Sequence, residues 1–287
     1  RMSIDPARLD HDLLADRVAY HDDEVPFVLL WSEKSGCTAL LTWFLAHTSR
    51  YEEAADHGLW MHDWEVDVMR RRPGNVDRLR ERIVEGAPIY KLVRSPYDRV
   101  VSSFLTLFEF DEDADHPTIG MRRAVREFVY GHRDVAYSFS LRHYLGWLET
   151  LDIDAIDGHH RPQTTALDLR LAELGVPVTY IHLEQLDDGL REIERRHGLE
   201  HVDRSTLRPP PHHTNRSPFR FENRSAIADL QPTIPLGAGP GMPAMPLPAD
   251  FMATDVINRV ERLFGRDLEL LGYERPDADS NMGRSAP

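Results

Sequence analysis

The sequence predicts an α/β fold with a P-loop-like parallel sheet flanked by helices, and two observations carry this prediction. Short apolar runs of strand length recur along the chain, and segments with the periodicity of amphipathic helices separate them. Such alternation is typical of parallel sheets built from βα units. The third part of the prediction is an irregular C-terminal segment, because residues 205–248 hold half of the chain's 20 prolines.

Three strands and a series of helices follow from the pattern. The strands are expected at residues 26–31, 88–93 and 176–183. The helices are expected at 37–47, 70–85, 97–110, 121–130, 138–150, 186–197 and 256–271. Residues 51–64 read as an irregular segment or a short helix rather than a strand, and 111–117 and 152–162 read as loops.

The domain organisation is predicted to be simple. Residues 1–24 form an N-terminal extension with a short helix outside the sheet, 25–273 form one domain, and 274–287 form a polar tail. Within that domain, residues 205–250 are a Pro-rich segment placed to cover a nucleotide or substrate.

The composition narrows the class of partner. The chain has 287 residues, 41% hydrophobic and 29% charged, as expected of a globular protein. Its net charge of -14 disfavours general binding of nucleic acid or anionic membranes. Cys37 is the single cysteine, so no intramolecular disulfide can form, and no apolar segment in residues 1–23 has the length of a signal peptide or membrane span. We therefore expect a cytoplasmic protein without a membrane span; its oligomeric state is left open.

A polar turn after the first apolar run is the strongest local signal. Residues 25–31 are apolar, and a helical pattern begins after Ser32-Glu33-Lys34-Ser35-Gly36-Cys37-Thr38. The first amides of a helix, a lysine and two hydroxyls can surround an anion. Lys34 precedes the only glycine of the turn, unlike the lysine of a Walker loop. The alternative at this point is an ordinary helix start with an exposed lysine.

A second anion motif follows the second strand. Arg94 stands at the carboxyl end of that strand, the position at which open α/β sheets bind ligands. Pro96 suits the first turn of a helix, and Arg99 and Ser102 share a face of that helix because they are three residues apart. Arg99 could instead pair with an acidic neighbour for structural reasons.

Together the two motifs resemble those of sulfotransferases that use 3'-phosphoadenosine 5'-phosphosulfate (PAPS). Lys34-Ser35-Gly36-Cys37-Thr38 resembles the 5'-phosphosulfate loop, and Arg94-x-Pro96-x-x-Arg99-x-x-Ser102 resembles the 3'-phosphate motif. Later stretches are similar to the carbohydrate, Golgi-glycan branch: His159-x-x-Pro162-Gln163, Tyr180 to Leu186, His213 to Ser217 and Asp267 to Tyr273. The chain departs from that branch at His160, where a Trp or Phe is usual, and in showing no membrane anchor.

The resemblance implies a sulfotransferase fold and assigns residues to the nucleotide. Each end of PAPS is implied to have its own group of residues. The 5'-phosphosulfate is implied to bind to Lys34, Ser35, Gly36, Cys37 and Thr38, and the 3'-phosphate to Arg94 and Ser102. Arg99 is implied to support the second motif from behind. Asn215, Arg216 and Ser217 would lie in the loop that covers the nucleotide.

The expected reaction is sulfuryl transfer to a hydroxyl of a sugar, glycoconjugate or small biosynthetic intermediate. Lys34 would stabilise the leaving oxygen, and His62 or His159 would accept the acceptor's proton. His57, Glu65 and His160 are further candidates for the base. No metal is expected, since no His/Cys/Asp cluster has convincing metal spacing.

Three other interpretations remain at this stage. A nucleotide-dependent kinase would need a glycine-framed lysine and a carboxylate for Mg²⁺, whereas the second strand ends in Arg94. A non-catalytic nucleotide-binding module would not need Lys34. Catalysis by Cys37 as a nucleophile is disfavoured because the sequence shows no dedicated partner base.

Overall fold

The computed structural model describes residues 5–15, 19–58, 61–112, 116–207, 223–232 and 245–276. The chain forms two compact units. We call the first, Arg1–Arg94 with Gln163–Pro211, the sheet unit, and the second, Ser95–Pro162 with His212–Pro287, the helical unit. The single domain expected for residues 25–273 stays a prediction.

A three-stranded parallel sheet organises the sheet unit. The strands are β1 (Val28–Leu30), β2 (Ile89–Val93) and β3 (Val178–His182), in the order β1-β2-β3. Val28 pairs with Ile89, and Ile89 pairs with Val178, so the three strands run in one direction and end at one edge. The predicted class, an α/β chain with a parallel sheet and flanking helices, is confirmed.

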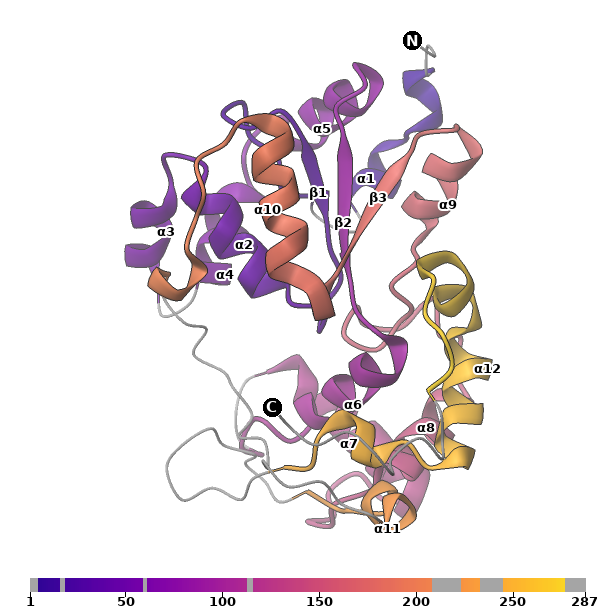
Figure 1. Cartoon of the computed structure of the whole chain (residues 1–287). Coiled ribbons are helices and arrows are strands. Elements are labelled where there is room, and N and C mark those ends of the chain that lie inside the picture. Colours follow the sequence, from indigo (N-terminus) through magenta and orange to yellow (C-terminus); the bar gives the residue numbers. More distant parts are fainter. Residues whose placement is uncertain are drawn as a thin grey trace. The chain divides into compact units, whose positions relative to one another are not determined.

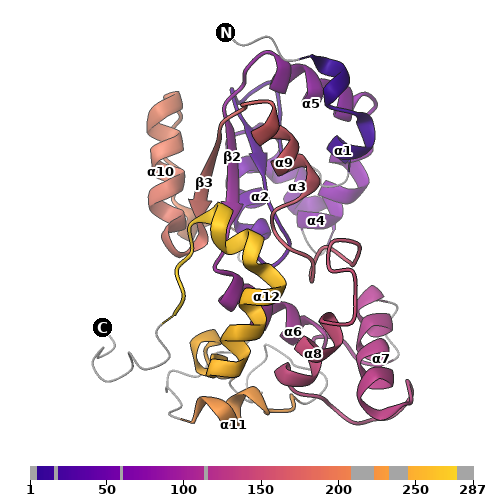
Figure 2. The same ribbon diagram turned by 90° about the vertical axis from the view of Figure 1, so that its right-hand side faces the viewer.

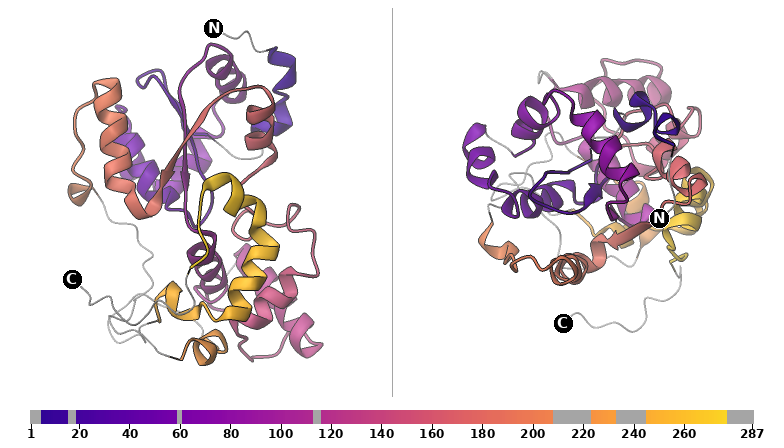
Figure 3. Two further views of the ribbon diagram at one scale, coloured as in Figure 1. Left: turned by 45° about the vertical axis from the view of Figure 1, so that its right-hand side comes forward. Right: turned by 90° about the horizontal axis from the view of Figure 1, so that it is seen from above.

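Helices cover both faces of this sheet. The helices are α1 (His11–Ala15), α2 (Cys37–Ala46), α3 (Tyr51–His57), α4 (Met61–Trp64), α5 (Asn75–Val84), α9 (Ala166–Glu173) and α10 (Leu186–His197). Shorter turns of helix are η1 (Pro6–Arg8), the π-helical η2 (Glu65–Met69), η3 (Leu183–Gln185) and η4 (Arg204–Thr206). Figures 1 and 2 show α10 on one side of the strands and α1, α5 and α9 on the other. Figure 3 repeats this separation in its left view, where α10 is orange and α1 indigo.

The alternation of side chains along the strands explains the two layers. Leu29 and Tyr90 point into a cluster with α2 and α10, whereas Val28, Leu30 and Ile89 point into a cluster with α5 and α9. Parallel strands buried on both faces are expected to be apolar throughout, as β1 is.

The described part of the helical unit contains helices around one core. These are α6 (Pro96–Thr106), α7 (Pro117–Tyr130), α8 (Leu141–Leu148), α11 (Arg224–Ala228), η5 (Pro248–Phe251) and α12 (Thr254–Leu271). Figure 2 shows α12 running beside α6 and α8. None of the described helices is both long and apolar enough to cross a membrane.

Most predicted elements lie where expected, and two helices, α9 and α11, were not predicted. Within 51–64, residues 51–57 and 61–64 are helical, as α3 and α4. Helix α9 was not predicted, although its start carries a capping signal: Thr165 and Asp168 cap each other across the first turn. The short helix α11 lies within the segment expected to be irregular; the remainder of that segment, 208–222 and 233–244, falls outside the described residues.

Candidate functional site

The polar loop after β1 has an unusual backbone. Ser35 N–H donates to Ser32 O at 3.2 Å and closes a tight turn. Within this turn Lys34 has a φ of 62°, in the left-handed region that non-glycine residues rarely adopt. Such strain persists only where surrounding contacts enforce it, and it is commonly found at binding sites.

Gly36 is required at the next step. Its φ is 89°, and a Cβ atom there would lie 2.6 Å from Leu183 Cδ1. Gly36 is the N-cap of α2, and within the described chain no side chain caps that helix. The first amides of an α-helix have no partners inside the helix, so the start of α2 is suited to an anion.

Gln163 joins this loop to the end of β2. Its Oε1 accepts from Ser35 Oγ at 2.7 Å and from Arg94 N–H at 2.9 Å, and its Nε2 donates to Arg94 O at 2.7 Å. The side chain is fully buried. One amide thus ties together the first motif, the second motif and the His-x-x-Pro-Gln stretch that the sequence singled out.

A buried ion pair holds Gln163 from below. Lys91 Nζ donates to Gln163 O at 2.7 Å and to Asp168 Oδ2 at 2.5 Å, and Asp168 also accepts from Thr165 N–H at 2.7 Å. Sequence reasoning missed Lys91 and Asp168. The available signal was a lysine inside an otherwise apolar strand, a residue type that is rarely buried without a partner.

Arg94 turns back onto the loop. Its Nη1 donates to Lys34 O at 3.1 Å, so the guanidinium fixes the carbonyl of the residue with the left-handed backbone. Ser35 Oγ is engaged with Gln163, and it shapes the loop in this structure. Direct binding of an anion by Ser35 stays a prediction.

His62 lies behind the loop, between Thr38 and Glu65. His62 Nε2 is 3.0 Å from Thr38 Oγ1, and His62 Nδ1 contacts Glu65 Oε2. Burial alone would lower the pKa of His62, but hydrogen bonds with Cys37 and Glu65 outweigh it and raise this pKa to about 9. His62 is therefore charged near neutral pH, which makes it a poor acceptor for a proton.

Glu65 is fully buried and has three further donors. Arg70 donates to Oε1 through Nη2 at 2.7 Å and through Nε at 3.2 Å, and Tyr20 OH donates to Oε2 at 3.3 Å. Burial would raise the pKa of Glu65, but its contacts with His62 and Arg70 hold it below its ordinary value. Glu65 is thus a carboxylate that orients His62.

Cys37 lies close enough to His62 to influence its pKa. Catalysis by Cys37 is disfavoured in the sequence because no dedicated partner base is evident; in the structure a hydrogen bond with Cys37 helps to raise the pKa of His62, and a charged His62 is not a base near neutral pH. Cys37 is a free cysteine of intermediate exposure. His62 follows Cys37 by 25 positions, and spacing alone does not show that the two side chains are neighbours.

The remaining predicted residues fall in the helical unit or outside the described chain. Ser102 lies on α6, and Arg99 on the same helix is buried and donates to Arg161 O at 2.7 Å and to Gly158 O at 2.9 Å. His159 Nδ1 contacts Asp157 Oδ1 at 2.7 Å, and its side chain is 41% exposed. Asn215, Arg216 and Ser217 are among the residues that the structure does not describe.

The other two histidines considered as the base, His160 and His57, both contact neighbouring side chains. His160 is buried and contacts Tyr144 OH through Nδ1 at 2.7 Å. His57 lies 3.5 Å from Asp67. Among the described residues, no group of three or more His, Cys, Asp or Glu side chains is arranged to hold a metal ion.

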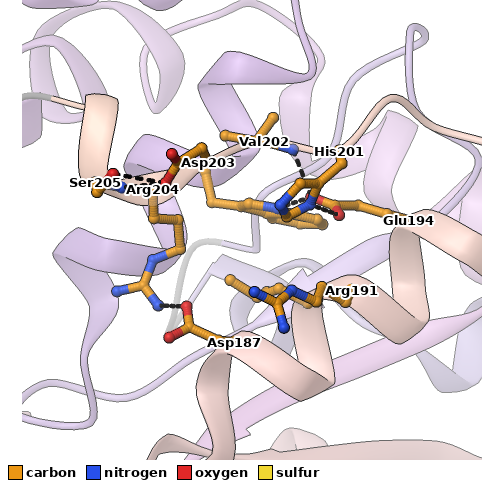
Figure 4. A pocket seen from close by; sticks show the side chains of 10 residues that line it. Asp187, Arg191, Glu194, His201, Val202, Asp203, Arg204 and Ser205 are labelled. Carbon is orange, nitrogen blue, oxygen red and sulfur yellow. Dashed lines mark hydrogen bonds and ion pairs between the residues drawn. The ribbon is translucent and has the colours of Figure 1, made fainter.

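A separate pocket of about 320 Å³ lies between α10 and residues 201–205 (Figure 4). Glu194 is one of the lining residues, and it accepts from Trp43 Nε1 at 2.8 Å and Val202 N–H at 3.1 Å and lies 2.8 Å from His201 Nδ1. None of the predicted site residues lines it. These contacts tie α2, α10 and the following segment together, which is a structural role.

Comparison of the chain with family models, curated proteins and solved structures found no match.

Proposed function

We propose that this protein is a sulfotransferase that moves a sulfuryl group from PAPS to an acceptor hydroxyl. The observation that supports this most is Gln163, whose amide bonds to Ser35 and to Arg94. Ser35 lies 128 positions from Gln163 in the sequence, and Arg94 lies 69 positions from it. Both were predicted to bind an anion, and both bond to this one buried side chain. An ordinary helix start with an exposed lysine would not need this link.

The proposed donor site is the start of α2 with Lys34. The uncapped amides of the helix bind the 5'-phosphosulfate, and Lys34 adds a positive charge. Arg94 binds the 3'-phosphate; a guanidinium has five N–H donors, so its bond to Lys34 O is compatible with this role. Ser102 and the segment with Asn215, Arg216 and Ser217 complete the nucleotide site in this proposal.

In the proposed reaction the acceptor oxygen attacks sulfur as the bond from sulfur to the bridging oxygen breaks. The electron pair of that bond moves to the 5'-phosphate, where Lys34 and the helix amides stabilise the growing charge. His159 takes the acceptor's proton, because Asp157 orients its ring and its side chain is partly exposed. The products are the sulfate ester and 3'-phosphoadenosine 5'-phosphate.

The proposed acceptor is a hydroxyl on a sugar, a glycoconjugate or a small biosynthetic intermediate. The net charge of -14 favours a neutral or cationic acceptor over a polyanionic glycan. A panel of acceptors with labelled PAPS would identify it.

Calorimetry without Mg²⁺ tests the nucleotide part of the proposal. We expect 3'-phosphoadenosine 5'-phosphate to bind more tightly than ATP, because its 3'-phosphate has a partner in Arg94. A kinase would show the opposite order once Mg²⁺ is added. Equal or tighter binding of ATP with Mg²⁺ contradicts a sulfotransferase.

A thiol enzyme is the second candidate, and the chain of contacts from Cys37 through His62 to Glu65 favours it. A histidine held by a carboxylate is a common partner for a nucleophilic cysteine. The Cys37→Ala variant separates the two candidates: a sulfotransferase retains turnover within a few-fold, whereas a thiol enzyme loses it. Basic Lys34 and Arg94 beside the loop favour the sulfotransferase.

A further inference from the structure

Thr38 is the one hydroxyl of the loop that touches a titratable ring. It is the second residue of α2, and its Oγ1 is 3.0 Å from His62 Nε2. In the proposed sulfotransferase this hydroxyl belongs to the 5'-phosphosulfate site. The Thr38 hydroxyl can donate its proton to an anion only if it is the acceptor in its hydrogen bond with His62.

The partners of His62 leave two arrangements. Glu65 is an ionised carboxylate and can only accept, so His62 Nδ1 must carry a proton. If the ring is neutral, Nε2 has a lone pair, and Thr38 donates its hydroxyl proton to His62. If the ring is charged, Nε2–H donates to Thr38 Oγ1, and the Thr38 proton can point elsewhere.

We infer that Glu65 keeps His62 doubly protonated, so that His62 Nε2–H donates to Thr38 Oγ1 and the Thr38 hydroxyl donates to the bound anion. The inference rests on the proposed function for the identity of that anion, a nucleotide 5'-phosphate or phosphosulfate. His62 then acts through Thr38 as a positioning residue, and Glu65 acts through His62.

The groups around His62 agree with a charged ring. Glu65 and the Cys37 side chain both hydrogen-bond with it and favour the proton, whereas Arg70 neutralises part of the charge of Glu65 and Tyr20 donates to the same carboxylate. With a pKa of about 9, His62 stays charged at neutral pH. As the pH rises through about 9, the ring loses the Nε2 proton, the Thr38 bond reverses, and the anion loses a donor.

Nucleotide affinity across pH tests the inference. Binding of 3'-phosphoadenosine 5'-phosphate is measured by calorimetry at pH 7.5 and pH 10 for the wild type and Thr38→Val. A hydrogen bond to a charged ligand predicts that Thr38→Val weakens binding about ten-fold to a hundred-fold at pH 7.5. At pH 10 the same substitution should cost no more than about two-fold to three-fold, because the bond is already reversed.

Two further variants isolate the histidine and the helix. In Glu65→Gln the ring loses a partner that raises its pKa while burial still lowers it, so the pKa of His62 should fall and the cost of Thr38→Val at pH 7.5 should largely disappear. Thr42→Val is the matched control, because Thr42 lies on the same helix and, among the described residues, its hydroxyl donates only to the carbonyls of Thr38 and Ala39. Repeating the series in Cys37→Ala removes the other titratable group that touches His62.

The imidazole resonances of His62, followed by NMR without nucleotide, give a test that needs no ligand. The inference expects both ring nitrogens to be protonated at pH 7.5, and one of them to be deprotonated at that pH in Glu65→Gln. A single protonated nitrogen in the wild type overturns the inference, as does an equal cost of Thr38→Val at both pH values. Absence of nucleotide binding at every pH overturns the proposed function instead, while the ring titration still decides the proton arrangement.

Discussion

Two buried polar networks hold the same loop, and they differ in what they contribute. On the Ser35 side, Gln163 is a neutral amide fixed by a buried ion pair between Lys91 and Asp168. On the Thr38 side, His62 and Glu65 form a pair whose charge changes with pH. The first network sets the shape of the loop, and the second sets its charge and the direction of its hydrogen bonds.

Breaking the ion pair between Lys91 and Asp168 should have the largest effect on the stability of the protein. Lys91→Met fills similar space but leaves Asp168 buried without its cation, so we expect a loss of about 3–5 kcal/mol in the free energy of unfolding. Urea denaturation measures it. Arg195→Met is the matched control, because Arg195 and Glu192 pair on the surface, and such pairs contribute only about 0–1 kcal/mol. Similar losses in both variants would contradict the role given to Lys91.

Removing the Gln163 side chain should come next. Gln163→Ala leaves Ser35 Oγ and both backbone groups of Arg94 without their partner, at a cost of about 2–4 kcal/mol in stability. Nucleotide affinity should fall with it, because the loop and the end of β2 lose their link. Gln185→Ala, an exposed glutamine of the same unit, should change neither quantity. Unchanged nucleotide affinity in Gln163→Ala would separate this residue from the site.

The pair of His62 and Glu65 should make the free energy of unfolding depend on pH. The pKa of His62 is raised from 6.5 to about 9, so its contribution is complete below pH 6.5 and disappears as the pH rises through 9. The shift corresponds to at most about 3 kcal/mol. Unfolding free energies measured between pH 6 and pH 10 should therefore fall more in the wild type than in Glu65→Gln. Parallel profiles for the two proteins would show that Glu65 does not hold the proton on His62.

The features predicted from the sequence are those set by neighbouring residues, namely the strands, the helices and the polar loop between β1 and α2. The apolar run before Lys34, the helix from Cys37 and the second strand before Arg94 all lie where the sequence places them. Gly36 was predicted as part of an anion loop, and its positive φ gives a backbone reason for a glycine there.

The rest depends on contacts between distant residues. Ser35 and Gln163 are 128 positions apart, and Lys91 and Asp168 are 77 apart, so no periodicity connects them. Glu65 was considered as a base, but only the structure shows it buried and facing His62 from three residues away. The burial that makes Glu65 an orienting group is a property of the packed core around α4 and η2, which helix spacing alone does not give.

The most direct test of the central claim is transfer of labelled sulfate from PAPS by the wild type and by Lys34→Ala, with nucleotide affinity measured in parallel. The account predicts that the wild type transfers label to a hydroxyl acceptor. Lys34→Ala should lose at least about a hundred-fold in turnover, in the range of other removed transition-state donors, while binding 3'-phosphoadenosine 5'-phosphate within about ten-fold of the wild type. Turnover of Lys34→Ala at the wild-type rate would contradict the placement of Lys34 at the breaking bond. A wild type that neither binds the nucleotide nor transfers sulfate would contradict the account as a whole.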